Sequence, residues 1–118
     1  MGQGGSIKVA AIRFLCEQRG SPEGELKDLL SKYFKSELAV SGAFLLRVTY
    51  GDSAEQQVAL CISGEGLDQK VVVENTSQIF RRLFNTEQSL DIIFLHAEQE
   101  REALKVGKPF YVQTVRAI

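Results

Sequence analysis

The chain has little of what usually reveals a chemical function. Its 118 residues include one histidine, and 14 basic and 15 acidic residues give a formal net charge of −1. Because these charges are spread along the chain, no basic surface of the kind that binds nucleic acid is expected. No apolar run approaches the roughly 18 residues that a membrane span requires. We therefore expect neither nucleic acid nor a membrane as a partner.

Cysteine is also scarce. Cys16 and Cys61 lack the CxxC spacing of a zinc site or a redox motif. Each lies among apolar neighbours, where a cysteine acts as a small hydrophobic side chain. With one histidine, a metal site would depend mostly on carboxylates, so we predict no metal and no cofactor. Residues 1–6 lack the blocks of a signal peptide, and we expect a flexible N-terminus and a cytoplasmic protein.

The remaining composition is that of a globular domain, with 44% hydrophobic and 25% charged residues. A chain of this length can bury about two-thirds of its unfolded surface. The sequence shows no internal repeat, low-complexity segment or linker. Residues 7–118 are therefore expected to form a single domain.

The first two predicted elements are a strand and a helix. Residues 7–15 fit both a helix and a mostly buried strand, and we favour the strand because the segment is apolar on every side. Ser21 followed by Pro22 is typical of an N-cap and a first helical residue. A helix is expected over about 22–35, and its apolar face would consist of Leu26, Leu29, Leu30, Tyr33 and Phe34.

A β-hairpin is predicted next. Residues 38–50 favour a strand, in which Gly42 indicates a bulge or a close backbone approach. Residues 51–53 have the composition of a turn, and residues 56–63 alternate as a returning strand. The two strands should therefore pair antiparallel.

The last third of the chain adds two helices and two strands. Asp68 is a plausible N-cap for a helix that ends near Phe84. Residues 90–95 are almost continuously apolar, which is typical of a strand covered on both faces. A short charged helix over 97–106 follows, and Pro109 begins a last strand, where its missing N–H costs least.

These elements predict an α/β (α+β) domain. Their order is strand, helix, strand, strand, helix, strand, helix, strand. We expect a mixed sheet of about four to five strands with two or three packed helices.

His96 is the first candidate for a functional residue, since it follows the strand 90–95. Histidine titrates near neutral pH and suits acid/base chemistry, and many α/β domains bind ligands at strand ends. The alternative, which we favour, is a surface residue at a helix start. No Ser-His-Asp or Cys-His-Asn pattern can be assembled from the sequence, so no catalytic residue is predicted.

The other candidate binding residues are Arg47, Pro109, Phe110 and Tyr111. If Phe110 points into the core, alternation places Tyr111 on the opposite sheet face, near His96. Aromatic residues are common in interaction surfaces. The alternative, which we favour, is that Tyr111 packs beneath a helix with its hydroxyl at the rim.

Arg47 lies on the predicted strand 38–50 close to Phe44, so a protein partner would bind around Phe44, Arg47 and Tyr111. A second arrangement would join Arg47 with Lys70, Arg81 and Arg82 in a small basic patch. At this net charge, scattered surface cations are the more typical arrangement.

The end of the chain resembles a known family. Leu90-Asp91-Ile92-Ile93-Phe94-Leu95, a short acidic helix and Lys108-Pro109-Phe110-Tyr111 are similar to the C-terminal domain of the enhanced-serine-sensitivity (SseB-like) bacterial proteins. The resemblance extends more loosely over residues 7–115. Val112 replaces the family's usual basic residue, and the family's N-terminal domain is not seen, so the chain is either an excised domain or a stand-alone relative.

The resemblance implies a cytoplasmic bacterial α/β domain without an established enzymatic activity, loosely linked to serine tolerance. It supplies no catalytic residues, and only Pro109, Phe110 and Tyr111 transfer as a motif. We therefore expect a non-catalytic protein-interaction or regulatory domain. The alternatives are a ligand-binding protein or enzyme with a pocket near His96 and Tyr111, and a self-associating module that forms a homodimer.

Overall fold

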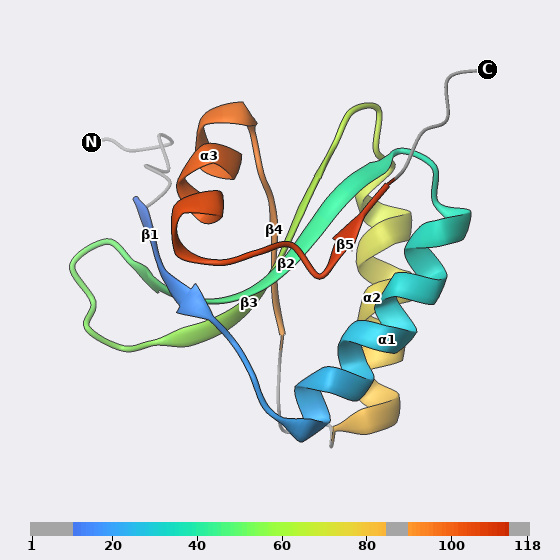
Figure 1. Cartoon of the computed structure of the whole chain (residues 1–118), viewed down its shortest axis with the longest axis horizontal. Helices are drawn as coiled ribbons and strands as arrows, with labels where there is room; N and C mark the ends of the chain where they lie inside the picture. Colours follow the sequence, from blue (N-terminus) through green and yellow to red (C-terminus); the bar gives the residue numbers. More distant parts are fainter. Residues whose placement is uncertain (1–10, 85–89, 114–118) are drawn as a thin grey trace, which may run out of the picture.

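The computed structural model describes residues 11–84 and 90–113 (Figure 1). The expected flexible segment 1–6 lies outside the described residues. The described residues form a five-stranded sheet and three helices, which confirms the predicted α+β class. The elements are β1 (Ile12–Glu17), α1 (Ser21–Ser36), β2 (Val40–Tyr50), β3 (Gln57–Gly64), α2 (Gln69–Leu83), β4 (Asp91–Phe94), α3 (Ala97–Val106) and β5 (Tyr111–Val112).

The long strand β2 is the centre of the sheet. β3 pairs with one edge of β2 in the predicted antiparallel hairpin, and β4 pairs in parallel with β3. The other edge of β2 is shared by two short strands. β1 pairs with its C-terminal half, where Ile12 lies opposite Tyr50, and β5 pairs with its N-terminal half, where Tyr111 lies opposite Ala43. The sheet is therefore mixed, and segments far apart in the sequence complete one edge of β2.

Helices cover both faces of this sheet. α1 and α2 lie side by side on one face, and α3 lies on the other (Figure 1). Alternate residues of β2 enter two separate cores, because successive side chains of a strand point to opposite faces. Leu45 packs toward α1 and α2, whereas Phe44 and Leu46 pack in the cluster that contains Ala103 of α3. This explains why β2 is apolar on both sides.

Residues 7–10 of the strand expected over 7–15 lie outside the described residues, and the described part is a strand at Ile12–Glu17. Helix α1 begins at Ser21, so its N-cap is Gly20 and not Ser21 as predicted. Gly20 has a φ of 148°, a conformation that residues with a side chain rarely adopt. The helix start is thus set by glycine geometry.

Gly42 shows both features that its place in a strand predicted. The register of the β2–β3 ladder shifts between Val40 and Gly42, which is a bulge. A Cβ on Gly42 would lie 3.2 Å from Oγ of Ser63 and 3.4 Å from the carbonyl oxygen of Tyr111. The missing side chain therefore lets β5 dock closely on β2.

Candidate functional site

The parallel strands β3 and β4 end side by side, and a hollow of about 560 Å³ lies at their C-terminal ends. This is the position at which open α/β sheets commonly bind ligands. Polar side chains from three segments line it, namely Ser41, Ser63, Glu65, His96 and Glu100.

His96 has a structural role in this hollow. Its Nδ1 accepts a hydrogen bond from the backbone N–H of Gln99 at 3.3 Å, and the Gln99 side chain accepts one from the backbone N–H of His96 at 3.1 Å. This reciprocal pair is a capping box at the start of α3. The favoured alternative for His96, a helix-start residue, is therefore the observed one.

The serines of the hollow bond to each other. The hydroxyls of Ser41 and Ser63 lie 3.2 Å apart, and Ser63 also donates to the carbonyl oxygen of Gly42 at 3.3 Å. Among the described residues, no hydrogen bond joins His96 to either serine. The two serines thus bond with each other and with β2, and His96 bonds with the start of α3.

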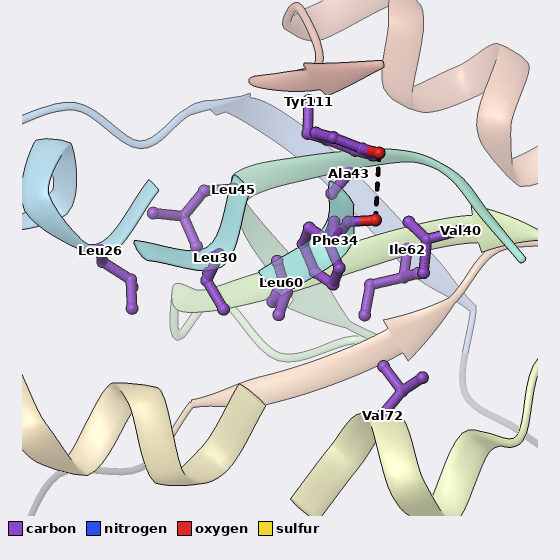
Figure 2. Packing of buried hydrophobic residues seen from close by; sticks show 10 residues of the cluster. All are labelled: Leu26, Leu30, Phe34, Val40, Ala43, Leu45, Leu60, Ile62, Val72 and Tyr111. Atoms are coloured by element: carbon purple, nitrogen blue, oxygen red, sulfur yellow. Dashed lines mark hydrogen bonds between the residues drawn. The ribbon is translucent and has the colours of Figure 1, made fainter. Parts of the chain in front are cut away.

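Tyr111 lies in the core beneath α1, with only 8% of its surface exposed (Figure 2). Its hydroxyl is 3.1 Å from the carbonyl oxygen of Phe34, near the end of α1, and 2.7 Å from Oε1 of Gln113. Burial raises the pKa of this phenol. The Phe34 carbonyl oxygen also accepts from the backbone N–H of Glu37 at 3.0 Å, so Tyr111 adds a second hydrogen bond to a carbonyl group at the helix end.

The expected separation of Phe110 and Tyr111 onto opposite sheet faces is wrong. Both rings pack against Phe34, with centroids 6.4 and 5.5 Å away. Strict alternation fails because Phe110 precedes the two paired residues of β5. Pro109 is half-buried just before them. Tyr111 is not among the residues that line the hollow at His96, so the structure does not bring these two candidates together.

Arg47 is exposed, as is His96. Its Nε donates to Oε1 of Gln18 at 2.7 Å, and its Nη1 donates to Oε1 of Gln56 at 3.1 Å. Phe44 is buried on the opposite sheet face from Tyr111. The three residues expected to form one surface thus contribute only Arg47 to it.

A second hollow, of about 360 Å³, lies beside Arg47 and was missed from the sequence. We call it the Arg47 hollow, because Gln56 contacts Arg47 and also lines this space. Its polar lining residues are Glu23, Gln56 and Gln57. Its apolar lining residues are Leu26, Leu45, Val58, Phe80, Phe84 and Leu90.

Other polar groups also act within the fold. The hydroxyl of Tyr50 donates to Oδ2 of Asp91 at 2.8 Å, which connects β2 to β4 across the sheet. Burial, and then the Asp91 carboxylate, raise the pKa of Tyr50 far above its ordinary value. Within residues 11–84 and 90–113, no group of three or more metal-binding side chains is found, and no helix is long and apolar enough to cross a membrane.

The two cysteines have different surroundings. Cys61 is buried, and burial raises the pKa of its thiol to about 12. Cys16 is exposed, which corrects the expectation that it packs as a hydrophobic side chain. Both thiols are free.

The fold and these contacts define a small α+β domain in which a Pro-Phe-Tyr segment docks the last strand onto the first helix. A family model described as the SseB protein C-terminal domain matches residues 15–113. The chain therefore belongs to the SseB C-terminal domain family, as its resemblance over residues 90–95 and 108–111 indicated. Comparisons with curated proteins and with solved structures gave no match.

Proposed function

We propose that this SseB C-terminal domain is a non-catalytic protein-interaction or regulatory domain that acts in the cytoplasm. The observation that carries this proposal is the use of the candidate chemical groups by the fold itself. His96 caps α3, Tyr111 bonds to α1, and the two serines beside His96 bond to each other. None of these groups stands ready for a proton transfer or a nucleophilic attack.

The surface around Arg47 supports binding to a protein. Arginine is enriched in protein interfaces, and this guanidinium is held in place by two glutamine side chains. A preorganised side chain loses less conformational entropy when a partner binds. The adjacent Arg47 hollow offers apolar surface, which is the other component of a typical interface core.

Affinity capture with variant domains tests the proposal. Bound proteins from a bacterial lysate would be quantified for wild type, Arg47→Glu and Arg101→Glu. Arg101 is an exposed arginine on α3, on the opposite side of the sheet, and serves as the matched control. We expect Arg47→Glu to lose the captured partner and Arg101→Glu to keep it. Equal recovery with all three proteins would contradict the proposed surface.

Homodimer formation is a separate proposal that the same samples can test. Sheet edges can pair between two copies of a chain, and β4 lies at one end of this sheet. Sedimentation velocity over a range of concentrations measures the mass directly. A single monomeric boundary at every concentration would contradict self-association and leave the protein-binding proposal intact.

A further inference from the structure

We propose that the Arg47 hollow binds a partner segment that presents bulky apolar side chains next to carboxylates. This inference rests on the proposed function and specifies the chemistry of the partner. It combines three features of the hollow, namely an apolar floor, a fixed guanidinium at the edge and a single acidic lining residue, which lies in the first turn of α1.

The Arg47 hollow is large enough to hold side chains of a partner. Its volume of about 360 Å³ lies at the lower end of the range for ligand sites, about 300–1,000 Å³. Phe80 and Phe84 form a stacked pair with centroids 4.6 Å apart, and both rings are only partly buried. Covering such rings is a main source of binding energy in interfaces.

The charge at the edge of the hollow favours an acidic partner. Arg47 donates only to two neutral amide oxygens, and no carboxylate of the described residues forms an ion pair with it. A guanidinium has five N–H donors, so several remain for a carboxylate.

Glu23 also lines the hollow and would by itself oppose an acidic ligand. Its carboxylate, however, lies against Gly20 at the start of α1, where a Cβ on the glycine would collide with it. The positive end of the helix dipole stabilises a carboxylate in this first turn. Glu23 therefore lies where the dipole of its own helix favours a negative charge, and it forms no ion pair with Arg47 among the described residues.

A peptide fits these features better than nucleic acid does. Binding to nucleic acid depends on many phosphate contacts, and the net charge of the chain is −1. A hollow with one fixed arginine and stacked aromatic rings instead matches the apolar anchor and adjacent charge of a short protein segment.

The probe is a capped, fluorescein-labelled peptide in which phenylalanine and leucine alternate with glutamate. Its matched controls replace every glutamate by glutamine, or every apolar residue by alanine. Fluorescence anisotropy should show binding of the first peptide and at least about tenfold weaker binding of both controls, since charge-assisted hydrogen bonds and aromatic anchors carry the affinity. Binding should also weaken as salt is added.

Two variants test the location of the site and leave the buried side chains of the core unchanged. Arg47→Gln removes the guanidinium, and Gln56→Glu places a carboxylate beside it, so each should weaken the acidic peptide about tenfold. Arg101→Gln should leave binding unchanged. Circular dichroism and thermal unfolding verify that every variant is folded.

Several outcomes would overturn this inference. Equal binding of the glutamate and glutamine peptides, or no effect of either variant, excludes the assigned chemistry. Binding of octanoate without any peptide binding shows that a small amphipathic carboxylate is the occupant. If Arg47→Glu abolishes partner capture while the acidic peptide does not bind, the proposed function stands and the partner chemistry is wrong.

Discussion

Tyr111 connects the last strand to the first helix through its contact with the carbonyl oxygen of Phe34. Tyr111→Phe keeps the ring and removes the hydroxyl, which leaves a buried helix-end carbonyl with one partner fewer. We expect the free energy of unfolding to fall by about 1–2 kcal/mol, measured by urea denaturation. Val112→Ala is the control, because Val112 is 61% exposed and should change the stability by less than about 0.5 kcal/mol.

Glu17 makes the stability depend on pH. Burial raises the pKa of its carboxyl, but the hydrogen bond and charge of Lys27 lower it and prevail, so the folded pKa lies below the ordinary value of 4.5. A lowered folded pKa adds stability above the unfolded pKa, and this stability is lost as pH falls through the folded pKa. The Lys27 ammonium lies 3.2 Å from the Glu17 carboxylate.

We therefore expect wild-type urea midpoints to fall below about pH 4.5, and Glu17→Gln to lose part of this fall. Glu17→Gln should also be less stable than wild type near neutral pH. Glu98→Gln, at an exposed position on α3, is the matched control. Parallel acid profiles for wild type and Glu17→Gln would show that the Lys27 pair does not contribute.

At the scale of elements, substitutions of His96 test whether this residue stabilises the start of α3 as its N-cap. His96→Asn keeps a capping oxygen, whereas His96→Ala removes the cap and should cost about 0.5–2 kcal/mol. Thermal unfolding of the two variants measures the difference. Equal stability of both variants and wild type would show that the capping box does not support the helix.

Elements with a long periodic pattern were predictable from the sequence. The hairpin of β2 and β3 and the capped helix α2 lie close to the predicted ranges, because apolar spacing and capping residues act locally. The direction of Phe110 was not predictable. It depends on where the ladder between β5 and β2 begins, and that ladder is set by contacts with Gly42 and α1.

At the scale of the whole molecule, Cys61 reports on global unfolding. Its thiol, on β3, is buried in the cluster between the sheet and α3, and burial raises its pKa to about 12, so it should react with a disulfide reagent only when the domain opens. The exposed Cys16 should react first. Cys16→Ser gives a protein with one slow thiol, and its reaction rate should rise with urea across the unfolding transition. Rapid reaction of this thiol in native buffer would contradict the buried core.

The candidate site beside Arg47 also depends on the arrangement of the whole molecule, and it was predictable from the sequence only in part. Arg47 was predicted as a binding residue because it is a charged residue on an otherwise apolar strand, and its role in binding stays a prediction. The hollow beside it combines Leu26 of α1, Val58 of β3 and Phe84 after α2, which no local pattern connects. A sequence shows that such side chains are apolar, but only the crossing of α1 and α2 over the sheet leaves Val58 and Phe84 partly uncovered.

The shared edge of β2 has a consequence for synthesis on the ribosome. β2 and its partner β3 emerge from the ribosome long before β5. The N-terminal half of the β2 edge that later pairs with β5 is therefore unpaired in the nascent chain. Unpaired strand edges attract other chains during folding. A chaperone that shields this edge would therefore matter most between the emergence of β3 and that of the Pro-Phe-Tyr segment, and chains that stall before Pro109 would be the ones most prone to aggregate.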